Sequence, residues 1–323
     1  MLHHHRSISA SAVLSLTFLF IQRSNVMQLL VDMDERFWKI EECRNKELKA
    51  ECLQKMKILK IKYRSYVSVL LSCILSYYYG RLIENRTADG DNLLFESYLP
   101  KGVPFWFMFL WMHIPGYGLS LLDITIDCTV FSIVSLTAIQ FKLLAYEMQN
   151  IFAEASDYFT IKDKFTRCND QLSFLLCFKT LLNNTLSTMM LMYLGMVVLI
   201  LCLEMYYIMT MNSFQGIVRA LIYAALIFFE FFICYCVPFQ ELVDESGKLV
   251  ECLYDSRWYE HVGSTAPYAK AMLLLQGKSQ MNVMLTAGGF LKMNLQTGLA
   301  TLKTMVSYSM FLKTMAGLED DMK

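Results

Sequence analysis

Acidic side chains inside long apolar stretches are the residues of this chain most suited to chemistry. Asp123 and Asp127 stand one helical turn apart in one such stretch, and Glu230 lies in the middle of another. Ionisable groups are costly within a membrane and usually serve a function there. A wet vestibule or an ion path would suit the two aspartates, whereas placement among lipid headgroups at a helix end is the alternative. For Glu230, a hydrogen bond between two helices competes with ion binding.

Motifs for covalent or metal chemistry are absent from the sequence. It contains no P-loop, HExxH, GxSxG or CxxC pattern, and Cys234 and Cys236 have no second pair of ligands in the sequence around them. Apart from a run of three at residues 3–5, the histidines are His113 and His261, which fall on opposite predicted faces of the membrane. A nucleophile–base pair therefore has no histidine to use. We expect no catalytic residue, no bound metal, no cofactor and no enzymatic activity.

The last apolar stretch, 290–312, carries polar side chains along one face. Thr304, Tyr308, Phe311 and Met315 recur there at helical spacing. A semi-polar stripe on a membrane helix must face other helices or a column of water. Repeated around a symmetric oligomer, the stripe would line a pore. These four residues are our candidate pore residues.

Aromatic side chains gather near one predicted membrane face. Tyr78 and Tyr79 end the second apolar stretch, and Tyr117 and Tyr223 fall near the same level. Such a cluster would suit a small apolar ligand pocket. The alternative is an aromatic belt at the membrane interface.

Composition places these residues in a membrane protein. The 323 residues are 55% hydrophobic and 18% charged, and the mean hydropathy is +0.38. A soluble domain is nearer 45–50% apolar and about 25% charged. The net charge of zero removes the electrostatic case for binding nucleic acid. Membrane lipid is the expected surrounding instead.

The lengths of the apolar stretches predict how often the chain crosses the membrane. A bilayer core of roughly 30 Å needs about 20 mostly apolar helical residues. The predicted spans are about 8–31, 66–83, 119–146, 180–209, 216–239 and 290–312. We therefore predict an all-α fold, a polytopic membrane helical bundle that forms a single transmembrane domain over residues 1–323.

Local residue types predict how these spans begin and end. The polar stretch 32–64 is expected to be one helix, either an extension of the first span or a solvated surface helix. Pro115 and Gly116 are expected to break the helix ahead of the third span, and Pro238 to end the fifth. A cleaved signal peptide is the alternative for the first span, but no small-x-small site follows it.

The distribution of Lys and Arg predicts the orientation. These residues concentrate in the loops after the first, third and fifth spans, which are therefore predicted to be cytoplasmic, with both termini outside the plasma membrane. Asn85 begins an Asn-Arg-Thr glycosylation sequon in a loop predicted to be outside. Asp123 and Asp127 fall near the outer end of their span. An outside N-terminus without a signal peptide suggests a seven-span protein that lacks its first helix.

The C-terminal third resembles the insect odorant receptor family. Three ordered segments carry the resemblance: 236–259, 285–290 and 306–313. The first of these matches the family pattern at Ser246, Leu249, Tyr254, Trp258 and Tyr259. The last resembles the closing Ser-Tyr signature of the family, which ends in a leucine and a basic residue.

The resemblance implies a seven-helix odorant-gated cation channel with a cytoplasmic N-terminus. Such a subunit would form a heterotetramer with the olfactory co-receptor in the dendrite of an olfactory sensory neuron. Residues 240–289 would form the cytoplasmic anchor between subunits, and Phe311 would lie at the gate. A small volatile apolar ligand would bind in the outer half of the bundle and move the last helix.

Two alternatives stay open from the sequence. A G-protein-coupled chemoreceptor predicts the opposite sidedness for the Lys- and Arg-rich loops. A membrane transporter would show internal repeats with broken helices in matching halves.

Overall fold

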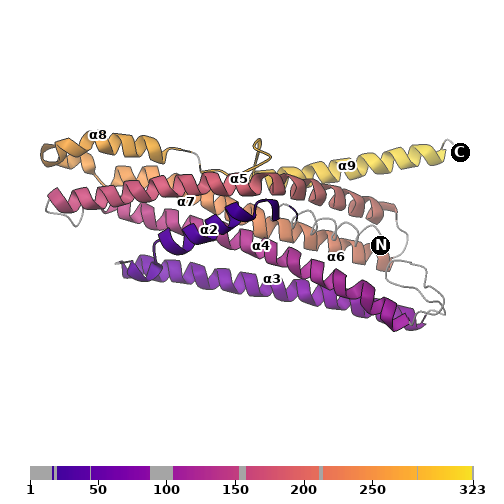
Figure 1. Ribbon diagram of the computed structural model, residues 1–323. Helices are drawn as coiled ribbons and strands as arrows, with labels where there is room; N and C mark the ends of the chain where they lie inside the picture. Colours follow the sequence, from indigo (N-terminus) through magenta and orange to yellow (C-terminus); the bar gives the residue numbers. More distant parts are fainter. Residues whose placement is uncertain are drawn as a thin grey trace. The chain divides into compact units, whose positions relative to one another are not determined.

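Helices make up almost all of the regular structure. The computed structural model describes residues 17, 20–43, 45–87, 105–152, 158–210, 214–281 and 283–321. The principal helices in this part of the chain are α2 (Arg23–Arg36), α3 (Lys46–Thr87), α4 (Phe105–Gln149), α5 (Tyr158–Thr210), α6 (Phe214–Phe231), α7 (Val237–Asp255), α8 (Val262–Ser279) and α9 (Leu295–Asp321) (Figure 1). A short hairpin pairs β1 (Thr286–Ala287) with β2 (Leu291–Lys292) in antiparallel fashion. The prediction of an all-α fold is confirmed.

Several helices are longer than a membrane crossing requires. Helices α3, α4 and α5 have 42, 45 and 53 residues. At a rise of 1.5 Å per residue, α5 is about 80 Å long, against a hydrocarbon core of about 30 Å. Among the described residues, three stretches are long and apolar enough to cross a membrane: Leu121–Gln149, Phe159–Ile208 and Ala220–Asp255. The polar ends of the long helices therefore extend past the hydrocarbon.

The chain divides into two compact units. The first comprises residues 1–20 and 39–129, and the second comprises residues 21–38 and 130–323. In the first unit, α3 and the opening part of α4 run in opposite directions (Figure 1). Each unit is described on its own below.

Helix α3 begins at a side-chain cap and continues far beyond the polar stretch. The Oδ1 atom of Asn45 accepts hydrogen bonds from the backbone N–H groups of Glu47 (2.8 Å) and Leu48 (3.2 Å). An asparagine in this role satisfies N–H groups that have no partner inside the helix. The helix then runs unbroken to Thr87, so residues 46–64 are joined to the second predicted span.

The prediction of one helix over residues 32–64 is wrong. Helix α2 ends at Arg36, and the chain passes through Phe37 and Trp38 before the 3₁₀ turn η1 (Ile40–Glu42). The Gln140 side chain holds the Trp38 backbone from both sides, because its Oε1 accepts the N–H (2.8 Å) and its Nε2 donates to the carbonyl (3.0 Å). These two bonds replace the helical partners that the Trp38 backbone would otherwise have.

The expected break ahead of the third span is also wrong. Helix α4 is continuous from Phe105 to Gln149 and passes through Pro115 and Gly116. An internal proline removes one helical hydrogen bond. Membrane helices tolerate this loss because neighbouring groups satisfy the freed carbonyl.

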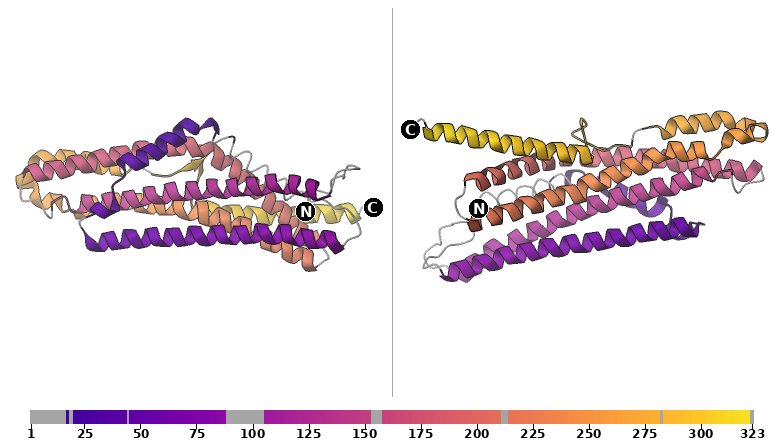
Figure 2. Two further views of the ribbon diagram at one scale, coloured as in Figure 1. Left: turned by 60° about the horizontal axis from the view of Figure 1, so that its bottom comes forward. Right: turned by 180° about the vertical axis from the view of Figure 1, so that it is seen from behind.

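Helix α5 is the centre of the second unit. It packs against α2, α6, α9 and β1, with α8 along its N-terminal half and α9 along its C-terminal half (Figures 1 and 2). Its buried side chains recur every three or four residues, the pattern of a helix with one face in a core. They include Leu172, Leu175, Leu182, Leu186, Met189, Tyr193, Val197 and Ile200.

Pro238 does not end the helical path after α6. A π-helical turn, η2 (Phe232–Cys236), follows α6 directly and leads into α7, which has Pro238 in its first turn. A proline at this place removes a backbone N–H and crowds the carbonyl four residues earlier. A wider turn with i→i+5 bonds accommodates both effects. The prediction that the helix ends near Pro238 is therefore wrong.

Candidate functional site

The semi-polar face of α9 is exposed. Thr304 is exposed, and Tyr308 and Phe311 are 53% and 56% accessible, with their ring centroids 6.2 Å apart. Met305 and Ser309, on the other side of the helix, are buried. The structure therefore brings three of the four candidate pore residues onto one open face, and the side chain of Met315 lies outside the described residues.

The segment before α9 is fixed to α5 by polar contacts. Asn183 Oδ1 accepts hydrogen bonds from the N–H (2.7 Å) and the hydroxyl (3.2 Å) of Thr286. Ser187 accepts the N–H of Gly288 at its carbonyl (2.9 Å) and the N–H of Gly289 at its hydroxyl (3.0 Å). Asn183 and Ser187 lie one turn apart on α5, so the hairpin sits on a single face of that helix.

A glycine allows the hairpin to lie close to α5. Gly288 and Gly289 have positive φ angles of 63° and 81°, a conformation that L side chains seldom adopt. A Cβ atom on Gly288 would lie 2.7 Å from Cδ2 of Leu191 on α5. The hairpin thus depends on glycine both for its turn and for its contact.

Glu230 takes part in a contact between helices. Its Oε1 accepts a hydrogen bond of 3.1 Å from the hydroxyl of Tyr193 on α5. The Tyr193 ring also packs on Tyr235 of the π turn, with centroids 4.6 Å apart. Of the two interpretations of Glu230, the structure contains the helix–helix hydrogen bond.

Asp127 lies buried beside a tyrosine of α3. The Tyr66 hydroxyl donates to its Oδ2 at 3.0 Å, and the Asp127 side chain is 2% accessible. Asp123 is half-buried one turn earlier on α4. The hydrogen bond from Tyr66 to this buried carboxylate therefore joins α3 to α4 within the first unit.

The candidate ligand residues lie on three helices. Tyr78 and Tyr79 are on α3, Tyr117 is on α4 and Tyr223 is on α6. Tyr223 is half-buried, whereas the other three side chains lie outside the described residues. The same holds for the side chain of Asn85, which is in the last turn of α3 rather than in a loop.

Basic segments that are far apart in the sequence meet at the N-terminal half of α5. Arg36 lies over the Phe174 ring, 4.0 Å from its centroid, and Arg167 lies 4.9 Å from the centroid of Trp38. Lys278, at the end of α8, donates hydrogen bonds to Asn169 (3.2 Å) and Ser173 (2.8 Å). One basic residue from each of the polar stretches after the first, third and fifth predicted spans therefore lies near the N-terminal half of α5.

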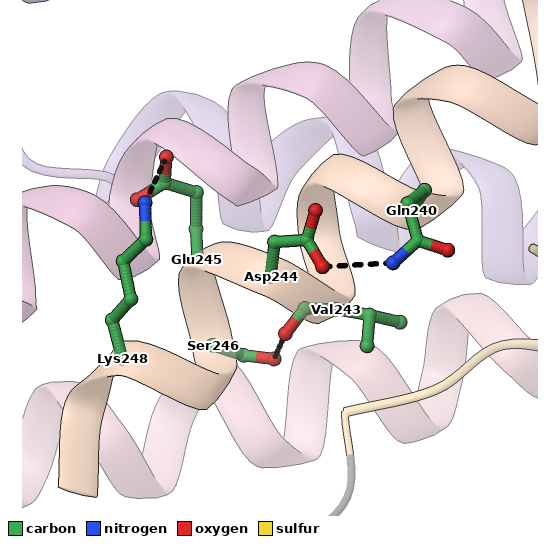
Figure 3. Close-up of polar contacts among 6 residues, drawn as sticks. All are labelled: Gln240, Val243, Asp244, Glu245, Ser246 and Lys248. Carbon is green, nitrogen blue, oxygen red and sulfur yellow. Dashed lines mark hydrogen bonds and ion pairs between the residues drawn. The ribbon is translucent and has the colours of Figure 1, made fainter. Parts of the chain in front are cut away.

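Helix α7 carries a compact set of polar contacts (Figure 3). The Gln240 Nε2 donates to Asp244 at 2.7 Å, and Lys248 lies 3.2 Å from the Glu245 carboxylate. Glu245 is buried, whereas its partner Lys248 is more than half exposed. The lysine therefore compensates the charge of the buried carboxylate from the protein surface.

Exposed aromatic rings lie in the last turn of α7 and just after it. Tyr254 and Tyr259 are 57% and 44% accessible, and their centroids are 5.6 Å apart. Trp258 stacks edge-on against Tyr259 at 6.3 Å. Arg257, which lies between Tyr254 and Trp258 in the sequence, has a φ of 54°, and this is uncommon for a residue with a side chain. The strained backbone holds a small aromatic group at the surface.

Among the described residues, no group of three or more His, Cys, Asp or Glu side chains is placed to hold a metal ion. The histidines at residues 3–5 lie outside the described residues.

Sequence reasoning missed the residues that hold Trp38 and the hairpin before α9. Asn183, Ser187 and Gln140 are ordinary polar residues in helices, and nothing in their spacing indicates a partner more than 100 residues away. The Gly288–Gly289 pair is a recognisable turn signal. Gly298 of α9, which lies against Cys236 of the π turn, has no comparable signal.

The fold and the apolar helices together define a polytopic membrane protein, and comparison with known proteins gives its family. Residues 7–306 match the family model described as 7tm odorant receptor. No match to this chain was found among the curated proteins. The chain belongs to the 7tm odorant receptor family and is an odorant receptor of the membrane helical-bundle fold.

Solved structures with this fold are similar over nearly the whole chain. The insect olfactory receptor OR5 from Machilis hrabei matches with a TM-score of 0.72 and 14% identity, over 95% of this chain and 78% of that chain. The structure of OR5 in complex with eugenol matches with a TM-score of 0.73 and 15% identity, over 96% and 79% of the two chains. At such low identities the likeness shows the fold.

Proposed function

We propose that this odorant receptor is the odorant-binding subunit of a ligand-gated cation channel. In this proposal it acts in a heterotetramer with the olfactory co-receptor, and the last helices of the four subunits surround the pore. The observation that carries the proposal is the exposed semi-polar face of α9.

That face suits a water-filled pore better than lipid. Thr304, Tyr308 and Phe311 are exposed on it, whereas Met305 and Ser309 on the other side pack inside the unit. The Thr304 hydroxyl donates to the Ala300 carbonyl at 3.0 Å, which leaves its oxygen lone pairs able to accept from water. Rings at one level of a symmetric assembly make a hydrophobic constriction, and we assign the gate to Phe311.

Residues 240–289 supply the surface for subunit assembly. Tyr254 and Tyr259 expose a large part of their rings beside Trp258, and Leu274 of α8 is also exposed. Tyr and Trp are enriched at the centres of protein interfaces. We take this region as the anchor of a single transmembrane domain that comprises the six predicted spans.

The proposed orientation places the C-terminus outside the plasma membrane. Support comes from the basic segments of the second unit, since Arg36, Arg167 and Lys278 all lie at one end of it. Positively charged segments of membrane proteins remain in the cytoplasm. In the same orientation Asn85 is extracellular and open to glycosylation. The cell membrane in question would be that of an olfactory sensory neuron dendrite.

The proposed ligand is a small, volatile, apolar molecule that binds near Tyr78, Tyr79, Tyr117 and Tyr223. The related receptor OR5 has been solved with eugenol, which is consistent with a small organic ligand for this fold. The ligand opens the channel by binding more tightly to the open arrangement than to the closed one.

Current recording tests this proposal. The chain is expressed with the co-receptor in a heterologous cell, and an odorant panel is applied while surface expression is verified. We expect cation current in response to at least one odorant, and none from cells that express the co-receptor with an unrelated membrane protein. Surface-expressed receptor that gives no current to any odorant above the co-receptor background contradicts the proposal.

A further inference from the structure

The π turn between α6 and α7 has an unusual set of neighbours. Residues five apart lie roughly 140° apart around an α-helix of 3.6 residues per turn. A turn with i→i+5 hydrogen bonds brings such residues to the same side. Glu230, just before the turn, and Tyr235, within it, are five residues apart and both contact Tyr193.

Tyr193 therefore contacts both ends of the turn with different parts of its side chain. Its hydroxyl donates to Glu230, and its ring packs on Tyr235 with a centroid distance of 4.6 Å. Tyr193 and Tyr235 are both buried. Conversion of the turn to α-helical register would rotate Tyr235 away from Glu230, so Tyr193 could keep only one of the two contacts.

The turn also contacts α9. Gly298 is buried, and a Cβ atom on it would lie 2.8 Å from Cys236 Sγ and 3.6 Å from Cδ2 of Phe232. Cys236 and Phe232 are the last and first residues of the π turn. A side chain at this position would clash unless it were bonded to Cys236, and the contact lies six residues before Thr304.

We propose that Tyr193 holds residues 232–236 in π register, and that this register sets the position of α9 through Gly298. The turn is then the link between α6, which carries the candidate ligand residue Tyr223, and the helix that carries the candidate pore residues. Tyr193 is a positioning residue in this link. The functional part of this inference rests on the proposed channel activity.

Pro238 favours a wide turn in this part of the chain, and the contacts of Tyr193 add to that preference. A π turn inside a helix is a local insertion that a sequence maintains only with specific contacts. A hydrogen bond between two membrane helices is one such contact, and its contribution is modest. Loss of the Tyr193 hydroxyl therefore shifts the balance between registers and leaves the helices folded.

A disulfide bond reports the register directly. In a disulfide, the Cβ of one cysteine lies about 3 Å from the Sγ of the other, given an S–S length of about 2.05 Å. The Cβ position of Gly298 is 2.8 Å from Cys236 Sγ, so Gly298→Cys should cross-link with the native Cys236. The rate in membranes, with copper–phenanthroline as the oxidant, is measured by mass spectrometry of the linked peptides.

The register claim predicts how the rate depends on the Tyr193 hydroxyl. In the Gly298→Cys background, Tyr193→Phe should slow cross-linking at least threefold, and Glu230→Leu should do the same. Glu230→Gln keeps an acceptor and should leave the rate within twofold. The double variant Tyr193→Phe/Glu230→Leu should be no slower than either single variant, because both remove the same bond.

Controls separate this effect from general loosening. Tyr206→Phe, 13 positions further along α5, should leave the rate unchanged, and Cys236→Ser should abolish the product. Equal rates for Tyr193→Phe and the parent would overturn the proposal, as would equal slowing by Tyr206→Phe.

Channel recording supplies the second arm. Once the wild-type chain gives currents, Tyr193→Phe should shift the half-maximal odorant concentration at least threefold, whereas Glu230→Gln should not. Unchanged dose–response curves would overturn the coupling between the turn and the pore. An absence of current from the wild-type chain would contradict the proposed function only, since cross-linking still decides whether Tyr193 holds the register.

Discussion

The hydroxyl of Tyr66 on α3 lies 3.0 Å from Oδ2 of Asp127 on α4. The predicted spans place Tyr66 at the cytoplasmic end of the second span and Asp127 near the outer end of the third, whereas the hydrogen bond brings the two residues to one level. Asp127 is thus a buried partner of a neighbouring helix, and its carboxylate is shielded from solvent. The hydrogen bond therefore stabilises the packing of α3 against α4 in the first unit.

Removal of the hydroxyl should weaken the first unit. Tyr66→Phe leaves the Asp127 carboxylate with one donor fewer and should cost about 0.5–2 kcal/mol, the range of intramembrane hydrogen bonds. Asp127→Asn keeps an acceptor and should cost less. Thermal unfolding in detergent measures both. Tyr63→Phe is the matched control, since Tyr63 is exposed on the same helix, and an equal loss in this control would contradict the role given to Tyr66.

The clamp on Trp38 should control access to the segment between α2 and α3. Gln140→Ala leaves the backbone N–H and carbonyl of Trp38 without the two bonds that the side chain supplies, a cost of about 1–3 kcal/mol. Local opening should rise about fivefold or more, and trypsin should cleave faster after Arg36 and Lys39. Gln149→Ala, on the exposed face of the same helix, should leave the cleavage rate unchanged. Equal rates for the two variants would show that Gln140 does not hold the segment.

The two hairpin glycines should differ in their tolerance of a methyl group. Gly289→Ala places a side chain in the left-handed region with nothing within 4 Å of it, at a cost of about 1–2 kcal/mol. Gly288→Ala meets the same strain and also Leu191 Cδ2 at 2.7 Å, so it should lower the melting temperature further. Leu191→Ala should recover part of the extra loss. Identical losses in the two glycine variants would contradict the close contact.

Apolar run length and helical spacing made much of the fold predictable. The all-α architecture, the apolar helices and the spacing of Thr304, Tyr308 and Phe311 follow from local periodicity, which neighbouring residues determine. The family was recognised from short ordered segments in the last third of the chain, and the match over residues 7–306 confirms it.

Breaks and long-range contacts were not predictable in the same way. The sequence predicts a helix break at Pro115 and a helix end near Pro238. Both prolines nevertheless lie within helical backbone, because tertiary surroundings override local preference. The backbone of Trp38, two residues after the end of α2, is bonded to a side chain 102 residues away. No single-sequence pattern carries such a pairing.

The candidate site was predictable in part. Thr304, Tyr308 and Phe311 lie on one exposed face of α9, as helical spacing indicates. Their role in a pore stays a prediction, as does the assignment of Tyr78, Tyr79, Tyr117 and Tyr223 to a ligand pocket. Their convergence depends on packing between helices, which periodicity does not encode.

Orientation can be tested at the C-terminus. An epitope fused after Lys323 should bind antibody on intact cells, because the basic segments hold the opposite ends of the helices in the cytoplasm. An epitope inserted after Ser256 should bind only after permeabilisation. Asn85→Gln should increase gel mobility if the sequon is used. An epitope after Lys323 that requires permeabilisation would reverse the topology and favour a G-protein-coupled receptor arrangement.

The pore assignment of α9 is the central claim, and cysteine accessibility tests it most directly. Thr304→Cys and Phe311→Cys are expressed with the co-receptor, and a positively charged methanethiosulfonate reagent is applied while odorant holds the channel open. Met310→Cys is the matched control, because Met310 is 56% accessible but faces away from the stripe. We predict rapid, persistent loss of current for the two stripe variants and none for Met310→Cys. Equal sensitivity of all three positions, or insensitivity of both stripe positions, would contradict a pore along this face.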